Sequence, residues 1–137
     1  MPKSWIEKRD CEKSFQIKII NKTFADIPEG SKMLIVSPPI IDDYIKNISF
    51  SRQSDLKTMR KDLALTYNAH KTCPVTTGIF LRIVAEAAYE EFLNGKDIGF
   101  ITPFWRVVQP GTKLAHKLAC GNSFIVKHRI NEGIEIQ

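Results

Sequence analysis

Apolar residues recur at helical spacing in two adjoining segments of the chain, 37–48 and 54–67. In the first segment, serine followed by proline is typical of a helix start, because proline suits the first helical position. The apolar residues at this spacing are Ile40, Ile41, Tyr44, Ile45 and Ile48. In the second segment, Ser54 or Asp55 is expected to cap the helix by accepting from free amides of its first turn. Its buried stripe is predicted to contain Leu56, Met59, Leu63 and Tyr67, and its outer face Lys57, Arg60 and Lys61.

A third helix is predicted over residues 75–95, with Thr76 or Thr77 as its cap. Asn94 and Gly95 are expected to end it, since both residue types tolerate the left-handed conformation that follows many helices. Its wide apolar stripe consists of Ile79, Phe80, Ile83, Val84, Ala87 and Phe92. The short connection between the second and third helices is typical of a helix-turn-helix.

After the third helix the pattern changes to that of extended chain. Residues 98–108 predict a strand, and the Gln-Pro-Gly-Thr turn that follows, before 113–115, indicates a β-hairpin. Residues 121–133 predict a short helix, capped by Asn122 or Ser123 and ended by Gly133, although the Phe-Ile-Val run within it also fits a strand. A last short strand is expected over 134–137.

These elements indicate one domain over residues 33–137, with residues 1–32 as an N-terminal extension packed on it. Within the extension, residues 15–20 fit a strand or an extended arm. Three helices followed by a hairpin are the order of a winged helix-turn-helix. The expected fold class is therefore mostly α with a small β-hairpin.

The distribution of charge says more than the net charge of +5. No aspartate or glutamate occurs from 98 to 131, and acids gather instead around Glu86, Glu90 and Glu91. Basic residues occur in two clusters, one with Arg52, Lys57, Arg60 and Lys61, the other with Arg106, Lys113, Lys117, Lys127 and Arg129. A one-sided basic surface favours a polyanionic partner, and a solvated face without a partner is the alternative.

Other features narrow the class of protein. No apolar run approaches the roughly 20 residues of a membrane span, and the polar start of the chain is unlike a signal peptide, so a cytoplasmic location without a membrane partner is expected. Three widely spaced cysteines argue against a disulfide framework, and no spacing indicates a metal site or a cofactor.

One cysteine invites a catalytic interpretation. Cys73 precedes the third helix, whose dipole lowers a thiol pKa, and His70 is the nearest candidate base. The alternative is a small buried residue in a turn.

The segment Pro103-Phe104-Trp105-Arg106-Val107 resembles the active-site segment Pro-Cys-His-Arg-Val of the alkylguanine-DNA alkyltransferases. The downstream run GTKLAHKLACGNSFIVKHRI follows that family's loop, glycine and final helix in order, and SPPIIDDYIKNI is similar to the first helix of its DNA-binding domain. A closer similarity is to small bacterial alkyltransferase-like proteins that also lack the reactive cysteine. The resemblance covers residues 33–133 and implies a winged helix-turn-helix that binds DNA.

The departures from the family's motif concern its chemistry. Phe104 stands where the family has the cysteine that accepts the alkyl group, and Trp105 where it has the histidine base, so the resemblance implies no alkyl transfer. The family's base-rotating tyrosine corresponds to Leu56, and its intruding arginine falls near Gly78, with Arg82 one turn later. Arg106 matches the arginine of the motif.

The sequence thus predicts a non-catalytic protein that binds duplex DNA and recognises a modified or distorted site without repairing it. The expected DNA contacts are Arg52, Lys57, Arg60, Lys61, Thr76, Thr77, Arg82, Arg106, Lys113 and Lys117. Phe104 and Trp105 either wall a pocket that stacks a base or fill the former site as core. On an alternating strand the two rings face apart, with Phe104 buried and Trp105 outward. Two alternatives are a protein-interaction domain that kept the fold and lost DNA binding, and a cysteine-dependent enzyme that uses Cys73.

Overall fold

The computed structural model describes residues 3–135 and is mostly helical, with one small three-stranded sheet. The helices of the described chain are α1 (Trp5–Arg9), α2 (Pro38–Lys46), α3 (Leu56–Thr66), α4 (Pro74–Leu93), α5 (Lys113–Lys117) and α6 (Gly121–Asn131). Two 3-10 turns, η1 (Ile98–Phe100) and η2 (Phe104–Arg106), precede α5. None of the helices within residues 3–135 is long and apolar enough to cross a membrane.

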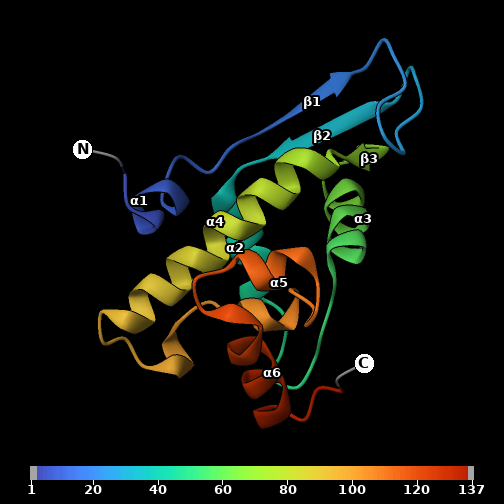
Figure 1. Ribbon diagram of the computed structural model, residues 1–137. Helices are drawn as coiled ribbons and strands as arrows, with labels where there is room; N and C mark the ends of the chain where they lie inside the picture. The colour runs from blue at the N-terminus through green and yellow to red at the C-terminus, as the bar shows by residue number, and fades with distance from the viewer. Residues whose placement is uncertain (1–2, 136–137) are drawn as a thin grey trace.

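The long helix α4 lies at the centre of the molecule. It packs against α1, α2, α3, β2 and η2. Figure 1 shows α1 on one side of α4, and α3, α5 and α6 on the other. The single apolar stripe predicted for α4 is only partly right. Val84 and Ala87 are buried, but Ile79 is 54% exposed, and Ala85 and Ala88 outside the predicted stripe are also buried, because several neighbours pack around this helix.

The helix starts follow local capping chemistry. α2 begins at Pro38 as predicted, although Ser37 Oγ accepts from the amide of Ser14 instead of from its own helix. Asp55 caps α3 by accepting from the amide of Thr58 at 2.6 Å. The predicted threonine cap of α4 is wrong, because Pro74 takes the first helical position and leaves Cys73 as the cap.

The ends of the helices also depend on the chemistry of nearby residues. α4 ends as predicted, with Asn94 at its C-cap and Gly95 at a φ of +102°. α6 ends before Gly133, which has a φ of +74°, and the Phe-Ile-Val run lies within this helix. Neither Asn122 nor Ser123 caps α6, since the cap position is Cys120. The strand expected over 134–137 is not seen at 134–135, and 136–137 lie outside the described residues.

The hairpin predicted after the third helix is wrong. Residues 101–105 are all buried, and the amides of Arg106 and Val108 bond back to Pro103 and Phe104, so this segment turns instead of extending. The Pro-Gly turn leads directly into α5, which Thr112 caps by accepting from the amide of Ala115 at 3.2 Å. Residues 98–118 therefore contain no β-hairpin that could serve as the wing of a winged helix-turn-helix.

The sheet comes from segments far apart in the chain. Its strands are β1 (Phe15–Ile19), β2 (Lys32–Val36) and β3 (Lys71–Thr72). β2 lies in the middle, antiparallel to β1 and parallel to β3. β1 therefore joins residues 3–31 to the remainder of the described chain through backbone hydrogen bonds, and α1 adds a packing contact with α4. The division at residue 33 stays a prediction.

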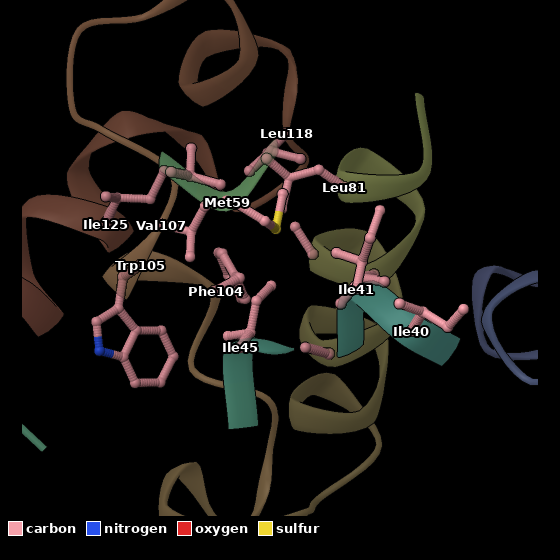
Figure 2. Close-up of a cluster of buried hydrophobic side chains, with 14 of the residues drawn as sticks. Ile40, Ile41, Ile45, Met59, Leu81, Phe104, Trp105, Val107, Leu118 and Ile125 are labelled. Atoms are coloured by element: carbon pink, nitrogen blue, oxygen red, sulfur yellow. The ribbon is translucent and has the colours of Figure 1, made fainter. Parts of the chain in front are cut away.

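The core lies beneath α4, between α2, α3 and the segment that contains η2. Figure 2 shows Phe104 in the middle of a cluster of aliphatic side chains, with Trp105 at its edge. Phe104, Ile41, Ile45 and Met59 are fully buried. The motif residue at 104 is thus a central core residue of the domain.

Candidate functional site

Both aromatic residues of the motif are buried. Phe104 is 0% exposed and Trp105 is 3% exposed, so the prediction that Trp105 points outward is wrong. The 3-10 turn η2 replaces the expected strand, and both rings therefore lie on the core side, with centroids 5.5 Å apart. Phe104 stacks on Phe124 of α6 at 5.8 Å, and Trp105 lies 4.8 Å from the ring of His128.

Glu132, directly after α6, collects the polar groups of this segment. Its carboxylate accepts from Trp105 Nε1 at 2.7 Å, from Arg106 Nε at 2.8 Å and from Arg106 Nη2 at 3.0 Å. The amide of Ser51 donates to the same carboxylate at 3.0 Å. Arg106 also donates from Nη1 to the carbonyl of Ile48 at 2.6 Å. One buried carboxylate thus fastens η2 to the end of α6 and to the loop after α2.

The ionisation of Glu132 follows from these contacts. Burial raises the pKa of this carboxyl, but hydrogen bonds from Arg106, Trp105 and Ser51, together with the Arg106 charge, outweigh burial and leave the pKa below its ordinary value. Glu132 is therefore a carboxylate at neutral pH and forms an ion pair with Arg106. We infer that it stabilises the fold and does not act as a general acid.

Sequence reasoning did not single out Glu132 or Arg129. Arg129 donates from Nε to the carbonyl of Trp105 at 2.8 Å and from Nη1 to Gln53 Oε1 at 2.9 Å. A usable signal for Glu132 was present, since it is the first acidic residue after the acid-free stretch. The sequence placed Arg129 in the second basic cluster, and no local pattern indicated its contacts with Trp105 and Gln53.

A cleft opens beside this cluster. It has a volume of about 530 Å³ and is lined by Trp105, Arg106, Phe50 and Phe100, among others. Phe50 and Phe100 are 65% and 74% exposed. The charged groups in the cleft are already paired, Arg106 with Glu132 and Lys46 with Asp42. The cleft is consequently apolar and close to neutral.

The hollow at the position of the family's base-rotating tyrosine is small. Leu56, Leu81, Val107 and Leu114 line a cavity of about 110 Å³ there. Typical ligand sites measure about 300–1,000 Å³. The cavity beside Leu56 is therefore smaller than a typical ligand site.

The predicted DNA contacts fall into two groups. Five are exposed and form no ion pair within the described residues: Arg52, Lys57, Lys61, Lys113 and Lys117. These five residues are called the basic surface below. They come from α3, α5 and the loop before α3, and Figure 1 shows both helices on the same side of α4.

The remaining predicted contacts are wholly or partly buried, and all but Thr76 have partners within the described residues. Arg60 was expected to face out but is half-buried, where it donates to Asp26 Oδ1 at 2.8 Å and to the Thr72 carbonyl. Arg82 lies over the Trp5 ring, with Glu86 3.6 Å away. Thr77 is fully buried and donates to the Cys73 carbonyl. Arg106 belongs to the Glu132 cluster, and Thr76 is half-buried in the first turn of α4.

The acids of α4 do not offset the basic surface. Glu86 is 4% exposed and accepts from the amide of Ala119. Glu90 accepts from the amide of Trp5, and Glu91 pairs with Arg9 and Lys96. These carboxylates face inward or toward α1, and none of them forms an ion pair with the lysines of α3 and α5 in the described chain.

Neither Cys73 nor Cys120 is placed to act as a catalytic nucleophile. Burial, together with the carboxylate of Glu86, raises the pKa of Cys120 to about 11. Cys73 is 4% exposed, and Nδ1 of His70 is occupied by the amide of Lys32 at 2.8 Å. Over residues 3–135 no group of three or more His, Cys, Asp or Glu side chains could hold a metal ion.

Comparisons of the chain with protein-family models, with curated proteins and with solved structures found no match. Membership of an alkyltransferase-like family therefore remains a prediction based on the motif segment.

Proposed function

We propose that this protein is a non-catalytic, alkyltransferase-like protein that binds duplex DNA through the basic surface. One observation carries the proposal. The exposed lysines of α3 and α5 have no acidic partner within the described chain, while the acids of α4 are consumed by internal contacts. When unpaired lysines on one side of a small domain contact DNA phosphates, the counterions condensed on the DNA are released. This release is the main source of affinity in sequence-independent DNA binding.

The arrangement of α3 and α4 supports a helix-turn-helix within this proposal. α3 ends at Thr66, α4 begins at Pro74, and the two helices pack against each other. In such a motif one helix enters a groove and its partner lies against the backbone. The exposed positions near the start of α4, Val75 and Ile79, are apolar and carry no sequence-reading donors. We therefore expect binding that depends on backbone charge and DNA shape more than on base sequence.

The motif segment supports the non-catalytic part. Phe104 carries no nucleophile and is enclosed by the core, and Trp105 uses its one polar atom on Glu132. Neither residue can accept an alkyl group or a proton. We therefore expect the protein to bind a modified site in DNA without itself becoming alkylated.

Incubation with benzylguanine is expected to leave the mass of the intact protein unchanged. Cys73 is 4% exposed, so its thiol is shielded from benzylguanine, and the pKa of Cys120 is about 11, so Cys120 forms no appreciable thiolate at neutral pH. Cys11 is exposed, and the variant Cys11→Ser controls for slow non-specific alkylation. A stoichiometric benzyl adduct that persists in Cys11→Ser would contradict the proposal.

Reversing two charges of the basic surface is expected to reduce the affinity for duplex DNA by about tenfold or more at low salt. The variant is Lys57→Glu with Lys61→Glu, and fluorescence anisotropy with a labelled duplex measures the change. Both residues are exposed, and Lys57 lies in the first turn of α3, where a glutamate favours the helix dipole, so folding should survive.

The matched control reverses Lys3, just before α1, and Lys8, within α1, which are both exposed. Figure 1 shows α1 on the opposite side of α4 from α3 and α5. The control makes the same change in net charge. Equal losses of affinity in the two double variants would show that only net charge matters and that the basic surface is not the binding face.

A further inference from the structure

A second, polar cleft lies between the start of α3 and the side of α6. It has a volume of about 410 Å³, and Gln53, Ser54, Thr58 and Arg129 contribute to its walls. It is separate from the apolar cleft beside Trp105, and its lining does not include the lysines of the basic surface.

Arg129 is the unusual residue of this cleft. It is only 2% exposed, and its two partners, the Trp105 carbonyl and Gln53 Oε1, are both uncharged. Its Nη2 is shielded from water and has no hydrogen-bond partner within residues 3–135. Burial lowers the pKa of Arg129, and no ion pair in the described chain offsets that cost. Buried guanidinium groups are normally compensated by an anion, because an unpaired buried charge is strongly unfavourable.

The start of α3 lies at the same cleft, and Asp55 already accepts from the amide of Thr58 in its first turn. This helix has eleven residues, and its first-turn amides carry the positive end of the helix dipole. Oxyanions bind at helix starts for this reason. Two carboxylates oppose the attraction, those of Asp55 and Glu135, which also line the cleft. A ligand held here would therefore bind weakly as long as Asp55 keeps its charge.

We infer that this cleft is a subsite for a tetrahedral oxyanion of the phosphate class, held by the Arg129 guanidinium and the start of α3. Because Nη2 is shielded, the oxyanion reaches the guanidinium by displacing the side chain of Gln53, an exposed residue. The group is either free phosphate or a phosphate of a DNA strand. Binding of a DNA phosphate rests on the proposed function, whereas the existence of the subsite does not.

Two substitutions test the subsite without removing Arg129, whose loss would damage the fold. Gln53→Glu places a carboxylate 2.9 Å from Nη1, so the protein supplies its own anion. This variant is expected to melt at a higher temperature than the wild type and to lose its response to phosphate. Asp55→Asn removes an opposing charge and keeps a good helix cap, so it is expected to bind inorganic phosphate about fivefold more tightly.

The measurement is the melting temperature over a range of phosphate concentrations, compared with chloride at equal ionic strength. Wild-type protein is expected to gain stability in phosphate beyond that in chloride, with the gain larger in Asp55→Asn and absent in Gln53→Glu. Equal behaviour in phosphate and chloride, or an undiminished phosphate response in Gln53→Glu, would overturn the inference.

A DNA arm identifies the source of the oxyanion. If Gln53→Glu loses duplex affinity while Gln53→Ala keeps it, the subsite takes a DNA phosphate. If Gln53→Glu loses only the phosphate response, the subsite takes a free oxyanion. Duplex binding without any phosphate response would refute the subsite and leave the proposed function standing, and the reverse result would refute the proposed function alone.

Discussion

Replacing Trp105 with alanine is expected to lower the free energy of unfolding by about 3–5 kcal/mol, because it removes a large buried ring and leaves a cavity. Trp105 is 3% exposed and lies against Phe104, Phe124 and His128. Its loss also leaves one oxygen of Glu132 without the indole donor. Denaturant unfolding at neutral pH measures the change.

Phe100→Ala is the matched control for this prediction. Phe100 is an aromatic residue on the same stretch of chain, but it is 74% exposed, so its removal is expected to change stability by less than about 0.5 kcal/mol. If Trp105→Ala remained nearly as stable as the wild type and instead weakened binding to modified DNA, Trp105 would be an exposed stacking residue and the core assignment would be wrong.

Replacing Glu132 with alanine is expected to cost a similar amount, about 3–5 kcal/mol, because it leaves the buried charge of Arg106 without its partner. The side chains of Arg106 and Glu132 are 13% and 6% exposed, so water cannot replace the lost carboxylate fully. Glu132→Gln keeps an oxygen acceptor and a similar shape, and it should be less damaging than the alanine variant. The same unfolding measurement ranks the three proteins.

The pH dependence of stability provides a second readout for Glu132. Because its pKa is lower in the folded protein than the ordinary 4.5, the carboxylate contributes stability above 4.5 that is lost as pH falls through the folded value. The difference in stability between wild type and Glu132→Gln should therefore shrink in acid. Glu29→Gln, at an exposed turn, should run parallel to the wild type. A difference that grew in acid would contradict the assigned role.

Helices α2, α3, α4 and α6 could be predicted from sequence because their signals are local, whereas α5 lies where a hairpin was predicted. Pro38, Asp55 and Gly95 each mark a helix boundary through their own backbone or side-chain chemistry, and apolar spacing located the segments between them. The stripe of α4 was less predictable, since a helix covered by several neighbours does not bury one face alone.

The sheet and the motif cluster depend on contacts between distant segments. β2 pairs with β3 across more than thirty residues, and no local pattern indicates that partner. At 101–105 a continuous buried run was interpreted as an alternating strand, although periodicity cannot separate a buried turn from a strand. Arg129 lies in α6 and Glu132 directly after it, and both bond to Trp105 only because the folded chain brings these segments together.

The affinity for duplex DNA as a function of salt tests the central claim most directly. With three to five phosphate contacts from the basic surface, the affinity should fall by roughly fortyfold to five-hundredfold between about 50 and 200 mM salt, because the logarithmic slope is about 0.9 per neutralised phosphate. Fluorescence anisotropy with one labelled duplex gives the full curve. The account predicts that slope and predicts that it decreases in the Lys57→Glu, Lys61→Glu variant. No complex at the lowest salt, or an affinity that does not change with salt, would contradict it and favour a protein-interaction domain without DNA binding.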